Sequence, residues 1–214
     1  MNILHIDSSI SGLGSASREL SAALVAAIAE RHPAARVTYR DVVADEIRHL
    51  SGAIAAGFRP SGVSDFDAAT RQEHRLSETL VSEFLAAELL VIGAPMYNFS
   101  IPSQLKAWLD RLAQVGRTFK YTEKGPVGLA GGKRVIVVSA RGGFYADGPL
   151  ASMDFQESYL KAFFGFLGIS DVDFIRVEGA SRGDAVRQQG LELARQAISE
   201  RFKAIQTPAI QATR

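Results

Sequence analysis

Five short apolar runs alternate along this chain with longer segments in which apolar residues recur every three to four positions. The runs lie at residues 2–7, 36–42, 88–94, 133–140 and 171–177 and are rich in Ile, Val, Leu and Phe. Apart from the more polar second run, they are almost continuously apolar, which is typical of a parallel sheet with helices on both faces. We therefore predict five strands in an α/β fold.

The segments between these runs have the periodicity of amphipathic helices, because their apolar residues would share one face. A helix between 152 and 167 would likewise place Phe163, Phe164 and Phe166 on one apolar face. Trp108 belongs to such a face and is expected in the core. The other shared-face residues are Leu20, Leu24 and Ile28; Leu76, Leu80 and Phe84; Leu105, Leu109 and Leu112; and Leu191, Ala194, Ile198, Phe202 and Ile205.

Parallel strands need right-handed helical crossovers, so the alternation predicts a doubly wound five-stranded parallel sheet with the strand order 2-1-3-4-5. We expect one domain over residues 1–206 and a flexible tail at 207–214. The long irregular span at 44–65 is predicted to be an excursion from this domain, of the kind that often forms a lid or a binding wall.

The composition excludes several classes of function. The 24 basic and 23 acidic residues give a net charge of +1, so the chain has no general attraction to nucleic acid or to anionic membranes. The lack of cysteine excludes disulfides, thiolate metal sites and thiol nucleophiles, and the four histidines match no metal-binding spacing. With no basic leader and no run near the ~20 apolar residues that span a bilayer, a cytoplasmic protein is expected.

In the predicted order, the loops that follow the first and third strands meet at the switch point of the sheet. The first of these loops, residues 8–17, carries five serines and two glycines and leads into a helix. The unpaired N–H groups of a helix N-terminus favour a phosphate, which serine hydroxyls would also contact. Arg18 is the only cation that we expect nearby. The simpler alternative is that Ser15 or Ser17 merely caps the helix.

The second loop carries four consecutive large side chains, Met96, Tyr97, Asn98 and Phe99, where a simple turn needs only small polar residues. The amide of Asn98 can both donate and accept, which suits the polar edge of a flat ring. The alternative is that these residues only pack the next helix against the sheet. Together with the serine loop, the pattern favours a phosphorylated ring compound, and we predict flavin mononucleotide (FMN).

A third loop, residues 139–144, follows the fourth strand. Its paired glycines, Gly142 and Gly143, would let backbone N–H groups approach a planar ligand and stabilise the negative charge of a reduced flavin. An ordinary glycine turn is the alternative. The glycine-rich segment 128–134 is not a phosphate-binding loop, because the spacing is wrong and it precedes a strand.

Four segments carry a resemblance to a known family: the serine loop, APMYNF at 94–99, TFKYTEKGP at 118–126 and SARGG at 139–143. The chain resembles the bacterial FMN-dependent NADH azoreductases, which are also quinone reductases and have a flavodoxin-like fold. The likeness runs from the first strand to the last helix, and APMYNF with the downstream Phe-x-Tyr-Thr-x-x-Gly-Pro segment is its most specific part.

The resemblance implies roles for individual residues. Ser9, Ser15, Ala16 and Ser17 would hold the FMN phosphate, with Ala16 acting through its backbone N–H. The residues that would surround the isoalloxazine ring are Pro95, Met96, Tyr97, Asn98 and Phe99 on one side and Ser139, Arg141, Gly142 and Gly143 on the other.

The resemblance also implies a homodimer with active sites at the subunit interface. Phe119 and Tyr121 would wall the substrate slot together with a phenylalanine of the second subunit, drawn from the pair Phe163 and Phe164. Aromatic walls suit flat acceptors such as quinones and azo compounds. NADH or NADPH would supply hydride through FMN in a ping-pong reaction, with Tyr121 as a candidate proton donor.

Two alternatives stay open at this point. An NADPH-dependent FMN or chromate reductase would share the fold and differ in substrate. A flavodoxin-like electron carrier would bind FMN without turning over a small molecule, although carriers are usually strongly acidic and this chain is nearly neutral. No residue in the sequence stands out as a general base, so the chemistry is assigned to the cofactor and not to a side chain.

Overall fold

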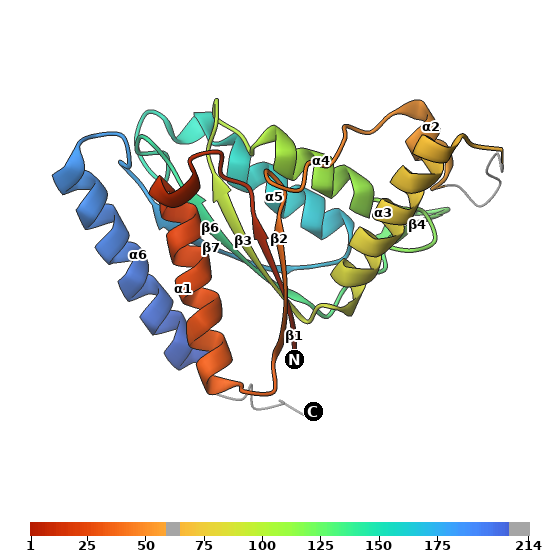
Figure 1. Ribbon diagram of the computed structural model, residues 1–214. Helices are drawn as coiled ribbons and strands as arrows, with labels where there is room; N and C mark the ends of the chain where they lie inside the picture. Colours follow the sequence, from red (N-terminus) through yellow and green to blue (C-terminus); the bar gives the residue numbers. More distant parts are fainter. Residues whose placement is uncertain (59–64, 206–214) are drawn as a thin grey trace.

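Five parallel strands form the central sheet of the computed structural model, which describes residues 1–58 and 65–205 (Figure 1). The elements are β1 (Asn2–Asp7), η1 (Gly12–Gly14), α1 (Ala16–Arg31), β2 (Arg36–Asp41), α2 (Gly52–Ala56), α3 (Ala68–Ala86), β3 (Leu89–Pro95), α4 (Ser103–Leu112), β4 (Phe119–Thr122), β5 (Gly125–Gly128), β6 (Arg134–Ala140), η2 (Ala151–Met153), α5 (Phe155–Phe166), β7 (Asp171–Val177) and α6 (Asp184–Ile205). The expected tail at 207–214 and the side chains of Phe202 and Ile205 lie outside the described part of the chain.

The strands of the sheet lie in the order β2-β1-β3-β6-β7, and every neighbouring pair is parallel. The expected order 2-1-3-4-5 reads 2-1-3-6-7 because two strands of a separate antiparallel hairpin, β4 and β5, come between β3 and β6 in the chain. This hairpin was not predicted from the sequence. Its two strands have four residues each and are mostly exposed, so they lack the apolar pattern of a sheet strand.

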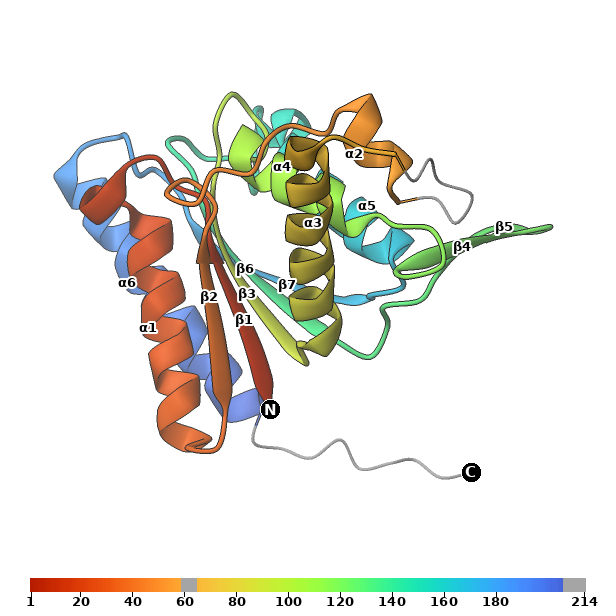
Figure 2. The same ribbon diagram turned by 45° about the vertical axis from the view of Figure 1, so that its right-hand side comes forward.

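Helices cover both faces of the sheet. Figures 1 and 2 show α1 and α6 side by side on one face and α3, α4 and α5 on the other. Each layer has its own apolar cluster. The first is built around Leu20, Leu24 and Leu191, and the second, larger one around Phe84, Trp108 and Phe164. Trp108 is fully buried, so the expectation that it belongs to the core is confirmed.

The span at 44–65 contains one short helix, α2, in its described part. The side chain of Ser51 caps this helix by accepting a hydrogen bond from the Ile54 N–H at 3.3 Å. The buried guanidinium of Arg111 then donates to the Arg48 carbonyl at 2.8 Å and to Glu73 of α3 at 2.7 Å. The excursion is therefore tied to the α3–α4 layer. Residues 59–64 of this span lie outside the described residues.

The β4–β5 hairpin projects from the body of the molecule beyond α5 (Figure 2). Its base lies directly against the turn that follows α5, where two glycine backbones meet. A Cβ on Gly128 would lie 2.1 Å from the Gly168 nitrogen, and a Cβ on Gly168 would lie 3.1 Å from the Gly128 carbonyl carbon. Gly168 also has φ 90, a conformation that side chains with a Cβ rarely adopt.

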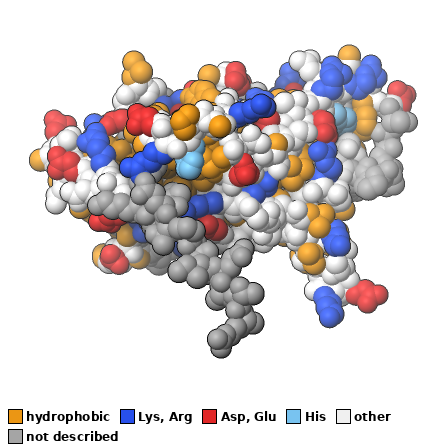
Figure 3. Space-filling model, turned by 90° about the horizontal axis from the view of Figure 1, so that it is seen from below, with side chains coloured by type: hydrophobic (Ala, Val, Ile, Leu, Met, Phe, Trp, Pro, Cys, Tyr) orange, Lys and Arg blue, Asp and Glu red, His pale blue; other side chains and the backbone are white. Residues whose placement is uncertain are grey.

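Viewed from the amino ends of the strands, the surface mixes basic and acidic side chains without a large area of one sign (Figure 3). None of the helices that the structure describes is long and apolar enough to cross a membrane.

Candidate functional site

Three loops lie side by side at the carboxyl edge of the sheet because they follow the adjacent strands β1, β3 and β6. Ser8, directly after β1, donates both its N–H and its hydroxyl to the Gly93 carbonyl, at 3.1 and 2.8 Å. On the other side of β3, the Met96 N–H donates to the Ala140 carbonyl at 2.7 Å. Ser8 is fully buried, and the sequence analysis had not assigned it a role.

Tyr97 joins the first loop to the second. Its hydroxyl accepts a hydrogen bond from the Ile10 N–H at 3.1 Å and lies 3.3 Å from the Ser9 hydroxyl. The prediction that the loops after Asp7 and Ala94 meet across one crevice is therefore confirmed. The order of the strands brings the loops together, and this one side chain sets their spacing.

The serine loop ends at the N-terminus of α1. Ser15 is the N-cap residue, and its hydroxyl accepts from the Arg18 N–H at 3.3 Å and lies 3.0 Å from the Ser17 hydroxyl. The simple capping role of Ser15 is thus present. The N–H groups of Ala16 and Ser17 have no acceptor within the described ranges 1–58 and 65–205. Two backbone donors and two hydroxyls therefore converge at a helix N-terminus, which is an arrangement that favours an anion.

The charge of Arg18 is already satisfied by the protein. Its guanidinium donates to both oxygens of Asp41, at 2.6 and 2.8 Å, and to the Ser9 carbonyl at 2.7 Å. The hydrogen bond from Arg18 holds the pKa of the Asp41 carboxyl below its usual value, so the pair stays charged at neutral pH. The expectation that Arg18 is the only cation near this loop was wrong, because Arg187 of α6 donates to the Gly14 carbonyl at 3.0 Å.

Residues 97–100 form a tight turn with an unusual backbone. Tyr97 and Ser100 exchange two backbone hydrogen bonds, at 3.0 and 3.1 Å, and the two residues between them have positive φ angles. Asn98 has φ 48 and Phe99 has φ 71. Asparagine tolerates this region, whereas for phenylalanine it is strained by about 1–3 kcal/mol. Strain of this kind persists only where the surroundings enforce it, and here the Phe155 N–H donates to the Phe99 carbonyl at 3.1 Å.

The glycine loop after β6 has its carbonyls turned to one side. The carbonyls of Arg141, Gly142 and Gly143 accept from the N–H groups of residues 179–181 at 2.9, 3.2 and 2.9 Å. The N–H groups of Gly142 and Gly143 have no acceptor among the residues described. These are the two backbone donors that the sequence led us to expect near a planar ligand. Space is short as well, because a Cβ on Gly142 would lie 2.8 Å from the Ser181 hydroxyl.

The side chains of Ser139 and Arg141 are both buried and form hydrogen bonds within the protein. The Arg141 side chain is 0% exposed and donates to Asp154 at 2.8 Å, to Glu178 at 3.3 Å and to Glu157. The Ser139 hydroxyl donates to Gln156 at 2.7 Å. Neither side chain is available to a cofactor. No pattern in the sequence pointed to the acidic partners of Arg141, because they come from the start of α5 and from the segment after β7.

The predicted substrate residues differ in exposure. Phe119 and Phe164 are 6% and 0% exposed, so both rings pack in the core of the single chain. Tyr121 is 71% exposed on the β4–β5 hairpin. Phe163 is half-buried and stacks on Tyr159 with 6.1 Å between ring centroids. Of the four predicted side chains, Tyr121 and Phe163 have the most accessible surface.

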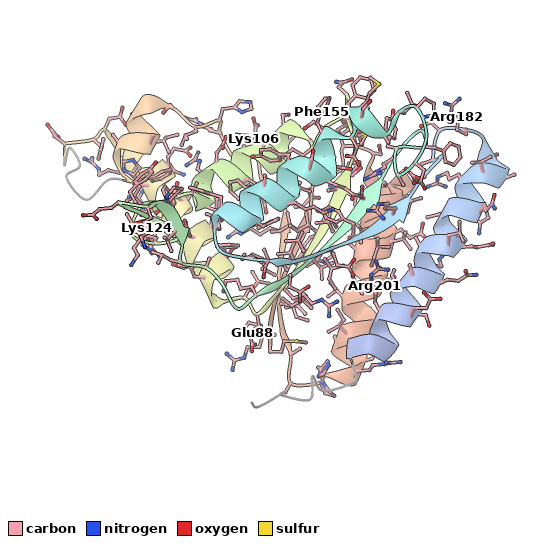
Figure 4. All side chains as sticks on the ribbon, turned by 180° about the vertical axis from the view of Figure 1, so that it is seen from behind. Glu88, Lys106, Lys124, Phe155, Arg182 and Arg201 are labelled. Atoms are coloured by element: carbon pink, nitrogen blue, oxygen red, sulfur yellow. The ribbon has the colours of Figure 1, made fainter. Side chains whose placement is uncertain are left out.

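A cavity of about 810 Å³ opens beside the 97–100 turn, between α4 and α5. This size is within the range of cofactor and substrate sites. Figure 4 shows Lys106 and Phe155 near this edge of the molecule, with Glu88 at the opposite end of the sheet. Burial raises the pKa of Tyr159, in the wall of the cavity, to about 12, so its hydroxyl stays protonated. The lining residues are Ile10, Met96, Tyr97, Asn98, Ser100, Ile101, Ser103, Gln104, Lys106 and Tyr159.

Comparisons with known proteins agree on one family. A family model described as "Flavodoxin-like fold" matches residues 1–202. The chain is 60% identical to an FMN-dependent NADH:quinone oxidoreductase of Ralstonia nicotianae over 94% of this chain and 96% of the relative. It is 57% identical to FMN-dependent NADH:quinone oxidoreductase 2 of Xanthomonas axonopodis pv. citri, over 96% and 95%.

Solved structures give the same result. An azoreductase from Bacillus anthracis str. Sterne superimposes with a TM-score of 0.82 at 28% identity, covering 94% of this chain and 99% of the other. An FMN-dependent NADH-azoreductase from Bacillus anthracis str. Ames Ancestor, in complex with FMN, gives a TM-score of 0.79 at 26% identity with the same coverage. The chain belongs to the flavodoxin-like family of the FMN-dependent NADH:quinone oxidoreductases.

Proposed function

We propose that this protein is an FMN-dependent oxidoreductase that uses NADH to reduce quinones by two electrons and azo compounds to aromatic amines. The observation that carries the proposal is the set of backbone donors at the ends of β1 and β6 that find no acceptor among the described residues, on either side of the Tyr97 bridge. Relatives that are named FMN-dependent NADH:quinone oxidoreductases, and neighbouring azoreductase structures, support the reductant and both classes of acceptor.

The residues around α1 fit the phosphate of FMN. The N–H groups of Ala16 and Ser17 and the hydroxyls of Ser9, Ser15 and Ser17 can donate to phosphate oxygens, and the helix N-terminus contributes partial positive charge. Of the two cations near this loop, Arg18 is neutralised by Asp41, and Arg187 donates to the Gly14 carbonyl. Binding here therefore depends on hydrogen-bond donors more than on charge.

The residues of the other two loops fit the ring. Pro95 to Phe99 would line one edge of the isoalloxazine, with the exposed amide of Asn98 as donor and acceptor, and the N–H groups of Gly142 and Gly143 would donate to the other edge. Ser139 and Arg141 would contribute by holding this loop in place, through the hydrogen bonds of their buried side chains.

Bound FMN would supply hydride transfer between NADH and the aromatic acceptor. The protein's own contribution is position and electrostatics. The donors of Gly142 and Gly143 would favour negative charge at the ring edge that they face, and the strained 97–100 turn would hold Asn98 at the other edge. Because NADH and the acceptor would use the same open face in turn, ping-pong kinetics are expected.

We further infer a homodimer in which Tyr121 of one subunit and Phe163 of the other border the substrate slot, since these two aromatic side chains are accessible. The crossovers fit a doubly wound sheet of order 2-1-3-4-5 once the β4–β5 hairpin is left out of the count, and residues 1–206 would form its single domain. Because NADH is the reductant, we place the enzyme in the cytoplasm.

The absorption spectrum of the purified protein, followed by anaerobic addition of NADH, tests this function. We expect flavin bands that bleach within seconds and return when a quinone is added. A colourless protein that takes up no added FMN would refute the proposal. Flavin that is bound but is bleached by neither NADH nor NADPH would identify an electron carrier instead, and bleaching by NADPH alone would favour an NADPH-dependent FMN or chromate reductase.

A further inference from the structure

One fully buried amide side chain connects the two loops that would hold the flavin ring. Gln156, in the first turn of α5, is 0% exposed. Its Nε2 donates to the Ala94 carbonyl at 3.0 Å, and its Oε1 accepts from the Ser139 hydroxyl at 2.7 Å. Ala94 directly precedes the Pro95–Phe99 segment, and Ser139 lies near the end of β6, shortly before Gly142 and Gly143. The amide therefore spans the ends of β3 and β6.

The two strands reach the end of their ladder at this point. Ala94 and Pro95 pair with Ser139 and Ala140 in the last steps of the β3–β6 ladder. The Met96 N–H then donates to the Ala140 carbonyl at 2.7 Å. The hydrogen bonds of Gln156 thus add a side-chain connection between the two strands where their backbone pairing ends.

The orientation of the amide is fixed by its neighbours. The Ser139 hydroxyl accepts from Arg141 Nε at 3.0 Å and gives its single proton to Gln156. If the amide were turned over, its oxygen would face the Ala94 carbonyl, and two acceptors would be opposed. The chain of hydrogen bonds therefore has one direction, from Arg141 through Ser139 and Gln156 to Ala94.

The helix that carries Gln156 is itself anchored to both loops. Asp154 caps α5 by accepting from the N–H groups of Gln156 and Glu157, at 3.0 and 3.1 Å, and it also binds Arg141. Phe155 donates its N–H to the strained Phe99 carbonyl. Consecutive residues at the start of α5 thus contact the loop after β3 and the loop after β6, which gives Gln156 a rigid base.

We propose that Gln156 is a positioning residue for the flavin. It sets the spacing between Asn98 and the N–H donors of Gly142 and Gly143, and so sets the affinity and the midpoint potential of bound FMN. The inference rests on the proposed function. Because donors to the ring edge favour the reduced, more negative flavin, misplacing them should weaken binding of the reduced form more than that of the oxidised form.

Gln156→Met tests the proposal because it keeps the length of the side chain and removes both hydrogen bonds. We expect the Kd for FMN to rise about tenfold, the equivalent of one buried hydrogen bond. If reduced FMN loses about tenfold more affinity than oxidised FMN, the midpoint potential falls by about 30 mV. Both quantities are measured on the full-length protein, by FMN titration after flavin removal and by anaerobic redox titration of the flavin-loaded form.

Gln114→Met is the matched control. Gln114 is also a buried glutamine, and its Nε2 donates to the Arg111 carbonyl at 3.0 Å, but it lies after α4 and not between the loops. We expect it to lower thermal stability as Gln156→Met does, with Kd and potential unchanged. If Gln156→Met does not fold, Gln156→Glu replaces it, since it keeps the acceptor and loses the donor to Ala94, and the same changes are expected.

Two results would overturn the positioning role: an unchanged Kd and potential in the Gln156 variant, or equal changes in the Gln114 control. In both cases the wild-type protein binds FMN, and the proposed function stands. Wild-type protein that binds no FMN would instead refute the proposed function and the positioning role together.

Discussion

The loop after β1 and the loop after β6 both have backbone donors without acceptors in the described part of the chain, but they are held in place differently. The first loop is held mostly by hydrogen bonds between neutral groups, such as the Ser15 cap of α1 and the contacts of the Tyr97 hydroxyl with Ser9 and Ile10. The second is held by a buried cluster of charged side chains. Its anchor, Arg141, binds Asp154, Glu157 and Glu178.

The two loops should therefore respond differently to substitution. A loop that is held by neutral hydrogen bonds can lose one of them at a modest cost in stability, because no buried charge is left unpaired. The buried charges of the loop after β6 pair with charges of α5 and of the segment after β7. A substitution in this loop should therefore also lower the free energy of unfolding. We therefore expect changes near β1 to affect mainly cofactor affinity, and changes near β6 to affect stability as well.

The largest effect is expected from Arg141→Met. This change leaves three carboxylates close together without their buried cation, and losing one partner of a buried ion pair costs about 3–5 kcal/mol. The free energy of unfolding from urea denaturation measures it. Arg195→Met is the control, because Arg195 pairs with Glu19 at the surface with both side chains 47% exposed, and less than about 1 kcal/mol is expected there. Equal losses in the two variants would remove the distinction between the loops.

The double change Ser15→Ala and Ser17→Ala tests the first loop. Hydrogen bonds to a charged group are worth about 1.5–3 kcal/mol each, so the Kd for FMN should rise roughly 100-fold, while the preference among acceptors stays the same. Equilibrium titration with FMN measures this. Ser51→Ala removes a comparable cap from α2, away from the site, and should leave FMN binding unchanged. Stoichiometric FMN retained by the double variant after desalting would count against the assignment.

Tyr97→Phe tests the connection between the two sides. The change deletes the hydroxyl that accepts from Ile10 and contacts Ser9. About 1 kcal/mol of hydrogen-bond energy between the two loops should be lost, so FMN should bind about fivefold more weakly. Tyr145→Phe serves as the control, because the Tyr145 ring packs against Phe99 with 6.3 Å between centroids and lies next to the same turn. If only Tyr145→Phe weakens binding, the bridge has no role in holding the flavin.

The smallest effect on the cofactor is expected from Tyr121→Ala, since the hairpin lies outside both loops. FMN content should remain at the wild-type level, whereas kcat/KM for quinones and azo dyes should change. Steady-state kinetics with both acceptors measure this, with Lys120→Ala as the neighbouring control. Loss of FMN from the Tyr121 variant would show that this residue belongs to the cofactor site and not to the substrate slot.

The sheet could be predicted from the sequence because its signal is local. All five predicted strands agree with the observed ones to within one residue at each end, and residues 16–31 form α1 as expected. Hydrophobic periodicity indicates which residues face the core. In this fold each apolar run is a strand that the helices on both faces of the sheet bury, so the run itself carries the signal. The β4–β5 hairpin was missed because its exposed strands bury too little to show such a pattern.

The site could be predicted only as far as its parts are adjacent in the chain. The serine loop and the 95–99 segment were visible as motifs, and the strand order indicated that they meet. The partners of Arg141 and the bonds of Gln156 depend on how α5 packs across β3 and β6, which no spacing in the sequence records. The burial of Phe119 and Phe164 was likewise hidden, because periodicity does not tell a core aromatic from one at a surface slot.

The close contact between Gly128 and Gly168 fixes the base of the β4–β5 hairpin but does not constrain its tip. Residues 121–126 can change in length or chemistry without disturbing the sheet, whereas any larger residue at Gly128 or Gly168 would force two backbones apart. Selection for new acceptors therefore has a separate region on which to act. We expect descendants of this enzyme with different acceptors to diverge at the tip and to keep both glycines.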